Sequence, residues 1–255
     1  MSLEETLIKL PKAEKVVIIL SGGMDSTISM RLLVEKYGRE NVFALTFDYG
    51  QKQKEEINRA RDSTRILGVT HKVLDLSVLG ELSRGFSANT DKDIVMPTIK
   101  EVLGDPRPKT YVPNRNMILL SLAASYAEVN GATVIVTGLQ VNDEYSYWDC
   151  THNFVEYING TLGLNRNTRI RVEAPFIALS KQDEINLLLE MDGNVNLLAH
   201  TLTCYNPNAL GQSCGKCPSC AERIANFAKV GTPDVINYYK EIPWERLITS
   251  YQEKL

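Results

Sequence analysis

A loop rich in glycine and hydroxyl side chains, placed between an apolar run and a helix, is the first stretch suited to chemistry. The loop reads Ser21, Gly22, Gly23, Met24, Asp25, Ser26 and Thr27, and it follows the β-branched run 16–20. Glycines let the backbone approach an anion closely, and hydroxyls add donors beside the N–H groups of a new helix end. The pattern predicts a phosphate-binding loop; a tight strand-to-helix turn is the alternative.

The acidic residue in this loop needs its own explanation. The loop lacks both the Gly-Lys-Ser/Thr ending of a P-loop and the spread glycines of a dinucleotide fingerprint. A carboxylate at Asp25 would repel bound phosphate unless Mg²⁺ lay between the two charges, so we expect Asp25 to be linked to magnesium. A helix cap is the alternative role for Asp25.

Four cysteines form the second strong pattern. Cys204, Cys214, Cys217 and Cys220 have the spacing C-x9-C-x2-C-x2-C. Short x2 loops point thiolates at one centre, and four thiolates complete a tetrahedron around Zn²⁺ without leaving room for water. We therefore predict a structural zinc site, with an iron–sulfur cluster as the alternative. Cys150 lies outside this pattern, and no histidine has an evident claim as its base, so we expect a packed or base-lining residue.

Charged residues also stand at two expected helix starts. Arg115 and Asn116 precede the apolar helix expected over 117–129, where Arg can form two hydrogen bonds to phosphate or carboxylate. Lys181 follows Ser180, which we expect to cap a helix with Asp183 in a capping box. The first turn of a helix disfavours a cation, so a bound anion would explain Lys181, and an ordinary solvated lysine is the alternative.

Aromatic and acidic residues alternate between 138 and 150, after an expected strand end. Tyr147 and Trp148 could sandwich a flat heterocycle, and Asp143 or Asp149 could accept from the N–H groups of a guanine-like edge. An aromatic minicore with solvated acids fits the same sequence equally well.

The elements that must position these residues alternate between strand and helix. We expect strands at 16–20, 42–47, about 73–75 and 133–137, separated by helices. This order predicts an α/β fold with a doubly wound parallel sheet, whose ligands bind beyond the carboxyl ends of the strands. Asp48 and Gly138 fall at two of these ends. Segment 77–110 is too long for an ordinary connection, which favours an active-site lid over an unstructured surface insertion.

Composition limits the function classes. The chain has 255 residues, a formal charge of −3 and no apolar run long enough to span a bilayer. We expect a cytoplasmic protein without a membrane segment, and nucleic acid is a disfavoured partner because no basic footprint is present. We expect a catalytic ATP-binding domain over 1–197 and a zinc-binding module with a tail over 198–255.

Together, segments 21–27, 112–116, 138–150, 175–184 and 201–220 closely resemble the 7-cyano-7-deazaguanine synthases of the PP-loop ATP pyrophosphatase superfamily. The likeness runs from about residue 15 to residue 227. The lead into the cysteines, Thr-Leu-Thr-Cys-Tyr-Asn at 201–206, is far more specific than the phosphate loop alone. The resemblance implies an adenine-nucleotide alpha-hydrolase-like fold, with a small helical zinc module at the C-terminal end.

The resemblance also implies an activity in queuosine biosynthesis. Such an ATP-dependent carbon–nitrogen ligase adenylates 7-carboxy-7-deazaguanine, accepts ammonia to form the amide and then gives the nitrile preQ0, releasing AMP and pyrophosphate. It implies that Arg115 and Lys181 stabilise transition-state charge and that the ATP phosphates are contacted by Ser21, Gly22, Gly23, Asp25, Ser26 and Thr27. Met24, Asp48 and Gly138 are further candidates for ATP binding. The catalytic candidates are therefore Asp25, Ser26, Arg115 and Lys181. The cofactors implied are ATP, Mg²⁺ and Zn²⁺, and the assembly implied is a homodimer.

The sequence departs from the family pattern at three places. Residues 145–151 read Tyr-Ser-Tyr-Trp-Asp-Cys-Thr where the family usually has Ser-Gly-Tyr-Pro-Asp-Cys-Arg. Two alternatives therefore stay open. One is an enzyme that passes the adenylated acid to another amine, including one on a protein in antiphage defence; the other is a non-catalytic nucleotide-binding module. Asn114 stands where Gly is frequent in the family, and Asn is a residue that tolerates left-handed backbone. The tail after Val230 either covers a dimer surface or binds a partner.

Overall fold

A five-stranded parallel sheet forms the centre of the molecule in the computed structural model, which describes residues 2–97, 105, 108–141 and 147–253. The strand order is β3-β2-β1-β4-β5, and all four neighbouring pairs are parallel. The strands are β1 (Val16–Ile19), β2 (Val42–Asp48), β3 (Thr70–Asp75), β4 (Val134–Thr137) and β5 (Arg171–Glu173). The order reverses between β1 and β4, and ligands bind at such a switch point in doubly wound sheets.

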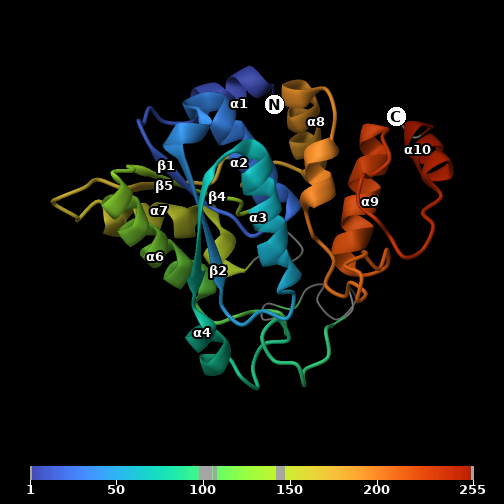
Figure 1. Cartoon of the computed structure of the whole chain (residues 1–255), viewed down its shortest axis with the longest axis horizontal. Helices are drawn as coiled ribbons and strands as arrows, with labels where there is room; N and C mark the ends of the chain where they lie inside the picture. The colour runs from blue at the N-terminus through green and yellow to red at the C-terminus, as the bar shows by residue number, and fades with distance from the viewer. Residues whose placement is uncertain (1, 98–104, 106–107, 142–146, 254–255) are drawn as a thin grey trace.

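Helices cover both faces of the sheet, which confirms the doubly wound fold predicted from the sequence (Figure 1). One face carries α2 (Met24–Tyr37), α3 (Glu55–Leu67) and α8 (Lys181–Asp192), against which α1 (Leu3–Lys9) packs. The other face carries α6 (Arg115–Asn130) and α7 (His152–Leu162). Short 3-10 turns lie at η1 (Arg39–Asn41), η2 (Trp148–Cys150) and η3 (Asn196–His200).

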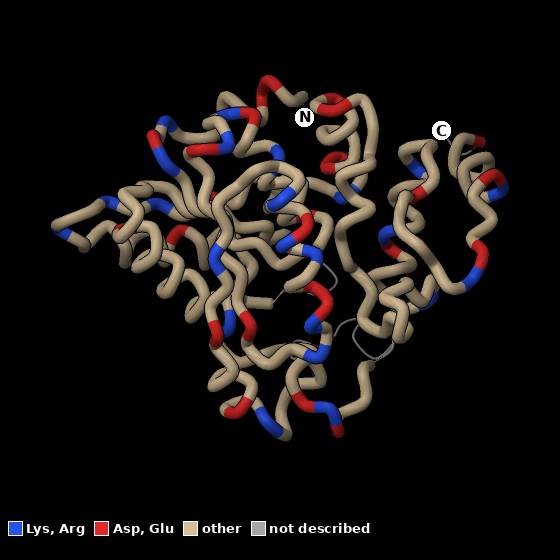
Figure 2. Tube along the Cα trace, viewed as in Figure 1, with Lys and Arg blue, Asp and Glu red and all other residues tan. Residues whose placement is uncertain are grey.

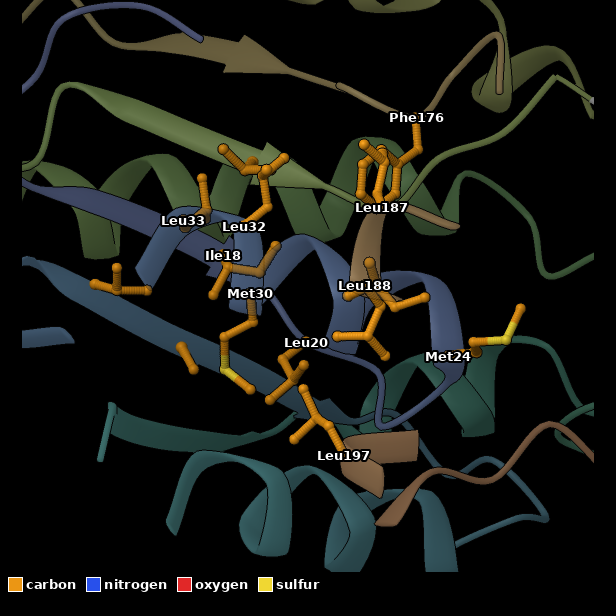
Figure 3. Packing of buried hydrophobic residues seen from close by; sticks show 14 of the residues in the cluster. Ile18, Leu20, Met24, Met30, Leu32, Leu33, Phe176, Leu187, Leu188 and Leu197 are labelled. Carbon is orange, nitrogen blue, oxygen red and sulfur yellow. The ribbon is translucent and has the colours of Figure 1, made fainter. Parts of the chain in front are cut away.

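Alternate residues of each strand enter different cores, as the period of a β-strand requires. Ile18 packs with Leu188 and other α2 and α8 residues (Figure 3), whereas Val17 belongs to the core that contains Leu120. Because β1 is buried on both faces, its sequence is a continuous apolar run. The phosphate loop that follows β1 is therefore held between two packed layers.

Two helix starts have the backbone geometry expected from the sequence. Asn114 adopts φ 54°, in the left-handed region that Asn tolerates, and caps α6. Ser180 caps α8, and its side chain and that of Asp183 form a reciprocal capping box. These caps fix Arg115 and Lys181 in the first turns of their helices.

The segment expected to be a lid contains α4 (Ser77–Leu82) and a series of turns. Two distant parts of this segment are joined, because the Ala88 N–H donates to the Lys109 carbonyl over 2.7 Å. Asn89 and Thr110 line the cavity described below. Parts of the predicted lid, 98–104 and 106–107, lie outside the described residues, so the lid stays a prediction.

The C-terminal region packs on itself. Helix α9 (Pro218–Val230) and helix α10 (Trp244–Gln252) stand side by side (Figure 1). Arg223 of α9 donates to both carboxylate oxygens of Asp234, and both side chains are completely buried. The Ser213 N–H donates to the Asn237 carbonyl, which joins the tail to the cysteine segment. The tail thus packs on the cysteine module of the same chain. The predicted boundary between two domains at 197/198 stays a proposal.

The described helices include no span that is both long and apolar enough to cross a membrane. Lys and Arg alternate with Asp and Glu along the trace (Figure 2), consistent with the formal charge of −3. This distribution gives no support to a nucleic-acid footprint.

Candidate active site and metal centre

A cavity of about 370 Å³ opens at the carboxyl ends of β1, β2 and β4. Its phosphate-loop end is lined by Ser21, Asp25 and Ser26, with Gly138 from the end of β4. Its opposite end is lined by Arg115, Asn116, Tyr147 and Asp149. Eight of the residues predicted to bind ligands therefore line one cavity, at the switch point of the sheet.

The phosphate loop is shaped by close packing against α3. Gly22 has φ +84°, and a Cβ atom there would lie 2.1 Å from the backbone oxygen of Glu56. Ser21 and Ser26 are joined by a hydroxyl–hydroxyl contact of 3.0 Å, and the Ser21 N–H donates to Ser26 Oγ. Gly23 is the N-cap of α2, so the free N–H groups of this helix end face the loop. This arrangement suits an anion.

Two residues of the loop point away from the cavity. Met24 and Thr27 are buried in the packing behind the loop and do not line the cavity. Their position supports a packing role for these two side chains. A nucleotide contact at Met24 would have to involve its backbone, and this contact stays a prediction.

Lys181 joins α8 to the phosphate loop. Its Nζ donates to both carboxylate oxygens of Asp25 at 2.8 Å and to Gln140 Oε1 at 3.0 Å. The side chain of Lys181 is 11% exposed and that of Asp25 is 28% exposed. Lys181 is therefore a fixed cation beside the phosphate loop rather than a solvated lysine.

A buried carboxyl completes this cluster. Although burial opposes the charged ammonium, the neighbouring Asp25 carboxylate raises the pKa of Lys181 above its ordinary value. Glu184 is buried, accepts from Gln140 Nε2 and has a pKa raised well above its ordinary value by burial and by the charge of Asp25. Burial and the neighbouring carboxylate thus favour the protonated form of Glu184 beside the ion pair of Lys181 and Asp25.

Asp149 anchors the opposite end of the cavity. Its side chain is buried, and its Oδ2 accepts from the Asn116 N–H at 3.2 Å. Asn116 Nδ2 donates to the Asp149 carbonyl at 3.0 Å and to Cys150 Sγ at 3.3 Å. Burial raises the pKa of the Cys150 thiol to about 11, so this thiol is protonated at neutral pH. Cys150 is a packed residue, as expected, and lacks the thiolate of a nucleophile.

The aromatic residues lie differently from a Tyr147–Trp148 sandwich. Tyr147 lines the cavity and stacks on Tyr111, with ring centroids 5.9 Å apart. Trp148 is 49% exposed, does not line the cavity and donates from Nε1 to the Tyr111 hydroxyl. Thr151 caps α7 by accepting from the Phe154 N–H. The structure therefore brings Tyr147 to the cavity and leaves Trp148 outside it, next to the same tyrosine.

Asp48, which was predicted to contact ATP, does not line the cavity. Asp48 accepts from the Gly50 N–H and pairs with Lys54 at 3.5 Å, at the end of β2. Asp143 lies outside the described residues. Both ligand roles therefore stay predictions.

Several cavity residues were not anticipated from the sequence. Glu56, Tyr49 and Tyr205 line the cavity. Burial raises the pKa of Glu56 to about 7, even though Arg115 opposes this shift. The signal that could have found Glu56 is its place in the first turn of α3, a few residues beyond the carboxyl end of β2. Helices that follow parallel strands begin at the ligand edge.

The four cysteines form one compact cluster. Their Sγ atoms all lie within 4.8 Å of one another, and the Cys214 and Cys220 sulfurs are 3.9 Å apart. A tetrahedral zinc ion with bonds of about 2.3 Å separates its sulfurs by about 3.8 Å, so the donor set fits one zinc. In a [4Fe–4S] cluster each cysteine would ligate a different iron, which needs a wider spacing. The cluster therefore favours the predicted zinc site.

The metal module also touches the phosphate loop. The Leu202 N–H donates to the Gly22 carbonyl over 3.0 Å, and Gln53 Nε2 donates to the Tyr205 carbonyl over 2.8 Å. Leu202 packs with the cysteines, and Tyr205 follows Cys204 directly. The segment that leads into the cysteine cluster thus forms one wall of the cavity.

Solved structures with a related arrangement include the NH3-dependent NAD synthetase from Campylobacter jejuni, with a TM-score of 0.45 and 18% identity over 78% of this chain and 77% of that chain. The U34-tRNA thiolase NcsA from Methanococcus maripaludis, solved with its [4Fe-4S] cluster, has a TM-score of 0.48 and 15% identity over 99% of this chain and 76% of that chain.

Sequence comparison is more specific. The family model for queuosine biosynthesis protein QueC matches residues 15–231. A 7-cyano-7-deazaguanine synthase from Oceanobacillus iheyensis is 40% identical over 88% of this chain and 98% of its own length. The synthase from Caldicellulosiruptor bescii is 38% identical over 90% of this chain and 100% of its own. With its phosphate loop, cavity and cysteine cluster, the chain belongs to the QueC family, together with these 7-cyano-7-deazaguanine synthases.

Proposed function

We propose that this chain is an ATP-dependent ligase that adenylates 7-carboxy-7-deazaguanine and converts it with ammonia, through the amide, to 7-cyano-7-deazaguanine. The observation that carries the proposal is a single cavity with a phosphate loop at one end and a buried Asp149 and Arg115 at the other. The names of the relatives supply the substrate class. The cavity supplies one place in which a nucleotide and a second small molecule would meet.

The phosphate-loop end would bind ATP. A carboxylate is a poor electrophile until its oxygen attacks the α-phosphorus and becomes part of a mixed anhydride, with loss of pyrophosphate. Stabilising the charge of that displacement is mainly electrostatic work. Arg115 supplies positive charge at the cavity lining, and Lys181 supplies a second fixed cation behind Asp25, which lines the cavity. Ser21 and Ser26 supply hydroxyl donors.

Asp25 would hold the magnesium ion. Its carboxylate lines the cavity and is partly exposed even with Lys181 bound, so oxygen lone pairs stay available to a hard cation. Magnesium would supply further charge neutralisation for the phosphates. Lys181 fixes the orientation of this carboxylate by donating to both of its oxygens.

The opposite end would bind the deazaguanine. Asp149 is held by Asn116 and would accept from the N–H groups of the base. The Arg115 guanidinium lies 5.9 Å from the centre of the Tyr49 ring, a contact that orients the cation. From there it would form charge-assisted hydrogen bonds to the substrate carboxylate.

The identity of the amine is the finer part of the proposal. Thr151 caps α7 and does not line the cavity, so this departure from the family arginine does not alter the cavity lining directly. The proposal therefore keeps ammonia as the amine, with transfer to another amine, including a protein amine, as the alternative. The homodimer expected from the resemblance stays a prediction.

Mass spectrometry of the products tests the proposal. Incubation with ATP, Mg²⁺, 7-carboxy-7-deazaguanine and ammonia should give AMP, pyrophosphate and the nitrile. Ser26→Ala should lose AMP formation, whereas Ser121→Ala, an exposed serine on α6, should retain it. A protein adduct among the products would replace ammonia by a protein amine in the proposal. Accumulation of the amide without nitrile would make the amide the final product. Absence of AMP from the unaltered chain would overturn it.

A further inference from the structure

Glu56 is an acidic residue in the cavity lining that has no role in the steps proposed above. It stands in the first turn of α3, and its side chain lines the cavity together with Arg115. Its backbone oxygen lies against Gly22, so that any Cβ on Gly22 would collide with it. The phosphate loop therefore holds the backbone of Glu56 in a fixed place.

The carboxylate of Glu56 differs from the other acids of this cavity. Asp25 is engaged by Lys181, and Asp149 is engaged by Asn116. Within the described part of the chain, no hydrogen bond or ion pair engages the side chain of Glu56. Glu56 is half-buried and lines the cavity in which the two substrates would meet. A carboxylate without a structural partner at such a place is available for proton transfer.

We propose that Glu56 is the general base that accepts a proton from the attacking amine. This inference rests on the proposed function. In the step, the nitrogen lone pair forms a bond to the carbonyl carbon of the acyl adenylate, and the bond from that carbon to the phosphoryl oxygen breaks. The electron pair leaves with AMP, and the proton released by nitrogen moves to a carboxylate oxygen of Glu56.

The surroundings of Glu56 suit such a base. Burial raises its pKa to about 7, with Arg115 opposing the shift, and a base with a pKa near the working pH is effective. Other titratable groups also line the cavity. Three charged ones come from helices or turns: Arg115 from α6, Asp25 from α2 and Asp149 from η2. Four tyrosines complete the set: Tyr49 directly after β2, and Tyr111, Tyr147 and Tyr205 in loops. On α3 itself, Glu55 pairs with Arg59.

The experiment separates the two half-reactions. Glu56→Gln should retain exchange of pyrophosphate into ATP driven by 7-carboxy-7-deazaguanine, because adenylation needs no amine. Amide formation from ammonia should fall about 10²- to 10⁴-fold, the usual contribution of general base catalysis. Glu55→Gln is the matched control. It makes the same change one residue away, at a side chain paired with Arg59, and should leave both half-reactions intact.

Two further readouts distinguish a base from a structural residue. With rates expressed per concentration of free ammonia, the unaltered chain should lose amide formation below about pH 7, and Glu56→Gln should lack this dependence. Hydroxylamine should partly rescue Glu56→Gln, because its addition product is more acidic and gives its proton to water more readily.

Three results would overturn this inference. Unimpaired amide formation by Glu56→Gln would remove the role of base. Equal loss of exchange and amide formation, with a raised KM for the acid, would make Glu56 a substrate-binding residue. No exchange in the unaltered chain would overturn the proposed function and this inference with it.

Discussion

Replacing Asp25 by alanine should destabilise the protein as well as remove a site residue. The change leaves the buried ammonium of Lys181 with Gln140 as its remaining hydrogen-bond acceptor among the described residues. Breaking a fully buried ion pair costs about 3–5 kcal/mol, and an exposed pair contributes about 0.2–1 kcal/mol. With side chains 11% and 28% exposed, we expect Asp25→Ala to lower the free energy of unfolding by about 2 kcal/mol.

A double-mutant cycle measures whether the loss arises from the stranded cation. Urea unfolding of Asp25→Ala, Lys181→Met and the double variant should show a coupling free energy of at least about 1 kcal/mol. The double variant should be more stable than Asp25→Ala alone, because no unpaired charge is left. Asp62→Ala is the matched control, since Asp62 pairs with Arg65 on the surface of α3. It should change stability by less than about 0.5 kcal/mol.

The cycle also has outcomes that would refute this reasoning. Strictly additive effects of the two substitutions would show that Asp25 and Lys181 do not stabilise each other. An Asp25→Ala variant as stable as the unaltered chain would show that the ammonium is solvated without its partner. In the expected case, each single variant loses AMP formation, and the rescued stability of the double variant does not restore it.

Three further predictions follow from the fold and the metal centre. Gly22→Ala should cost clearly more than Gly131→Ala in urea unfolding, because both residues have positive φ but only Gly22 would place a Cβ against backbone. Burial, aided by Arg61, lowers the pKa of His71 to about 4, so stability should fall as pH drops from about 6.5 toward 4. His71→Gln should flatten that slope, measured by urea midpoints. Elemental analysis should find one zinc per chain, and Cys217→Ser should lose both zinc and thermal stability.

Local patterns predicted the elements of the catalytic half well. The β-branched run before Gly22, the capping box at Ser180 and the left-handed Asn114 each depend on a few adjacent residues, and each has the expected geometry. The sheet order followed because alternating strands and helices allow few topologies. The spacing of the cysteines likewise predicted their cluster.

Long-range contacts could not be read from such patterns. The pairing of Lys181 with Asp25 joins residues 156 positions apart, and the buried pair Arg223–Asp234 depends on how the tail folds back. The position of Trp148 also depends on contacts that the sequence pattern did not reveal. The aromatic ring of Trp148 suggested a base-stacking residue, but Trp148 does not line the cavity and donates instead to the Tyr111 hydroxyl.

Two hydrogen bonds connect the cysteine module with the phosphate loop and with the segment before α3. Leu202 holds the Gly22 carbonyl, and Gln53 of the segment before α3 holds the Tyr205 carbonyl beside Cys204. Backbone hydrogen bonds of this kind fix positions that a mobile segment would leave free. Zinc would order the segment that carries both Leu202 and Tyr205, because a closed thiolate site contributes its binding energy to folding. A structural metal in this module would thereby influence the geometry of the proposed nucleotide site without touching the substrate.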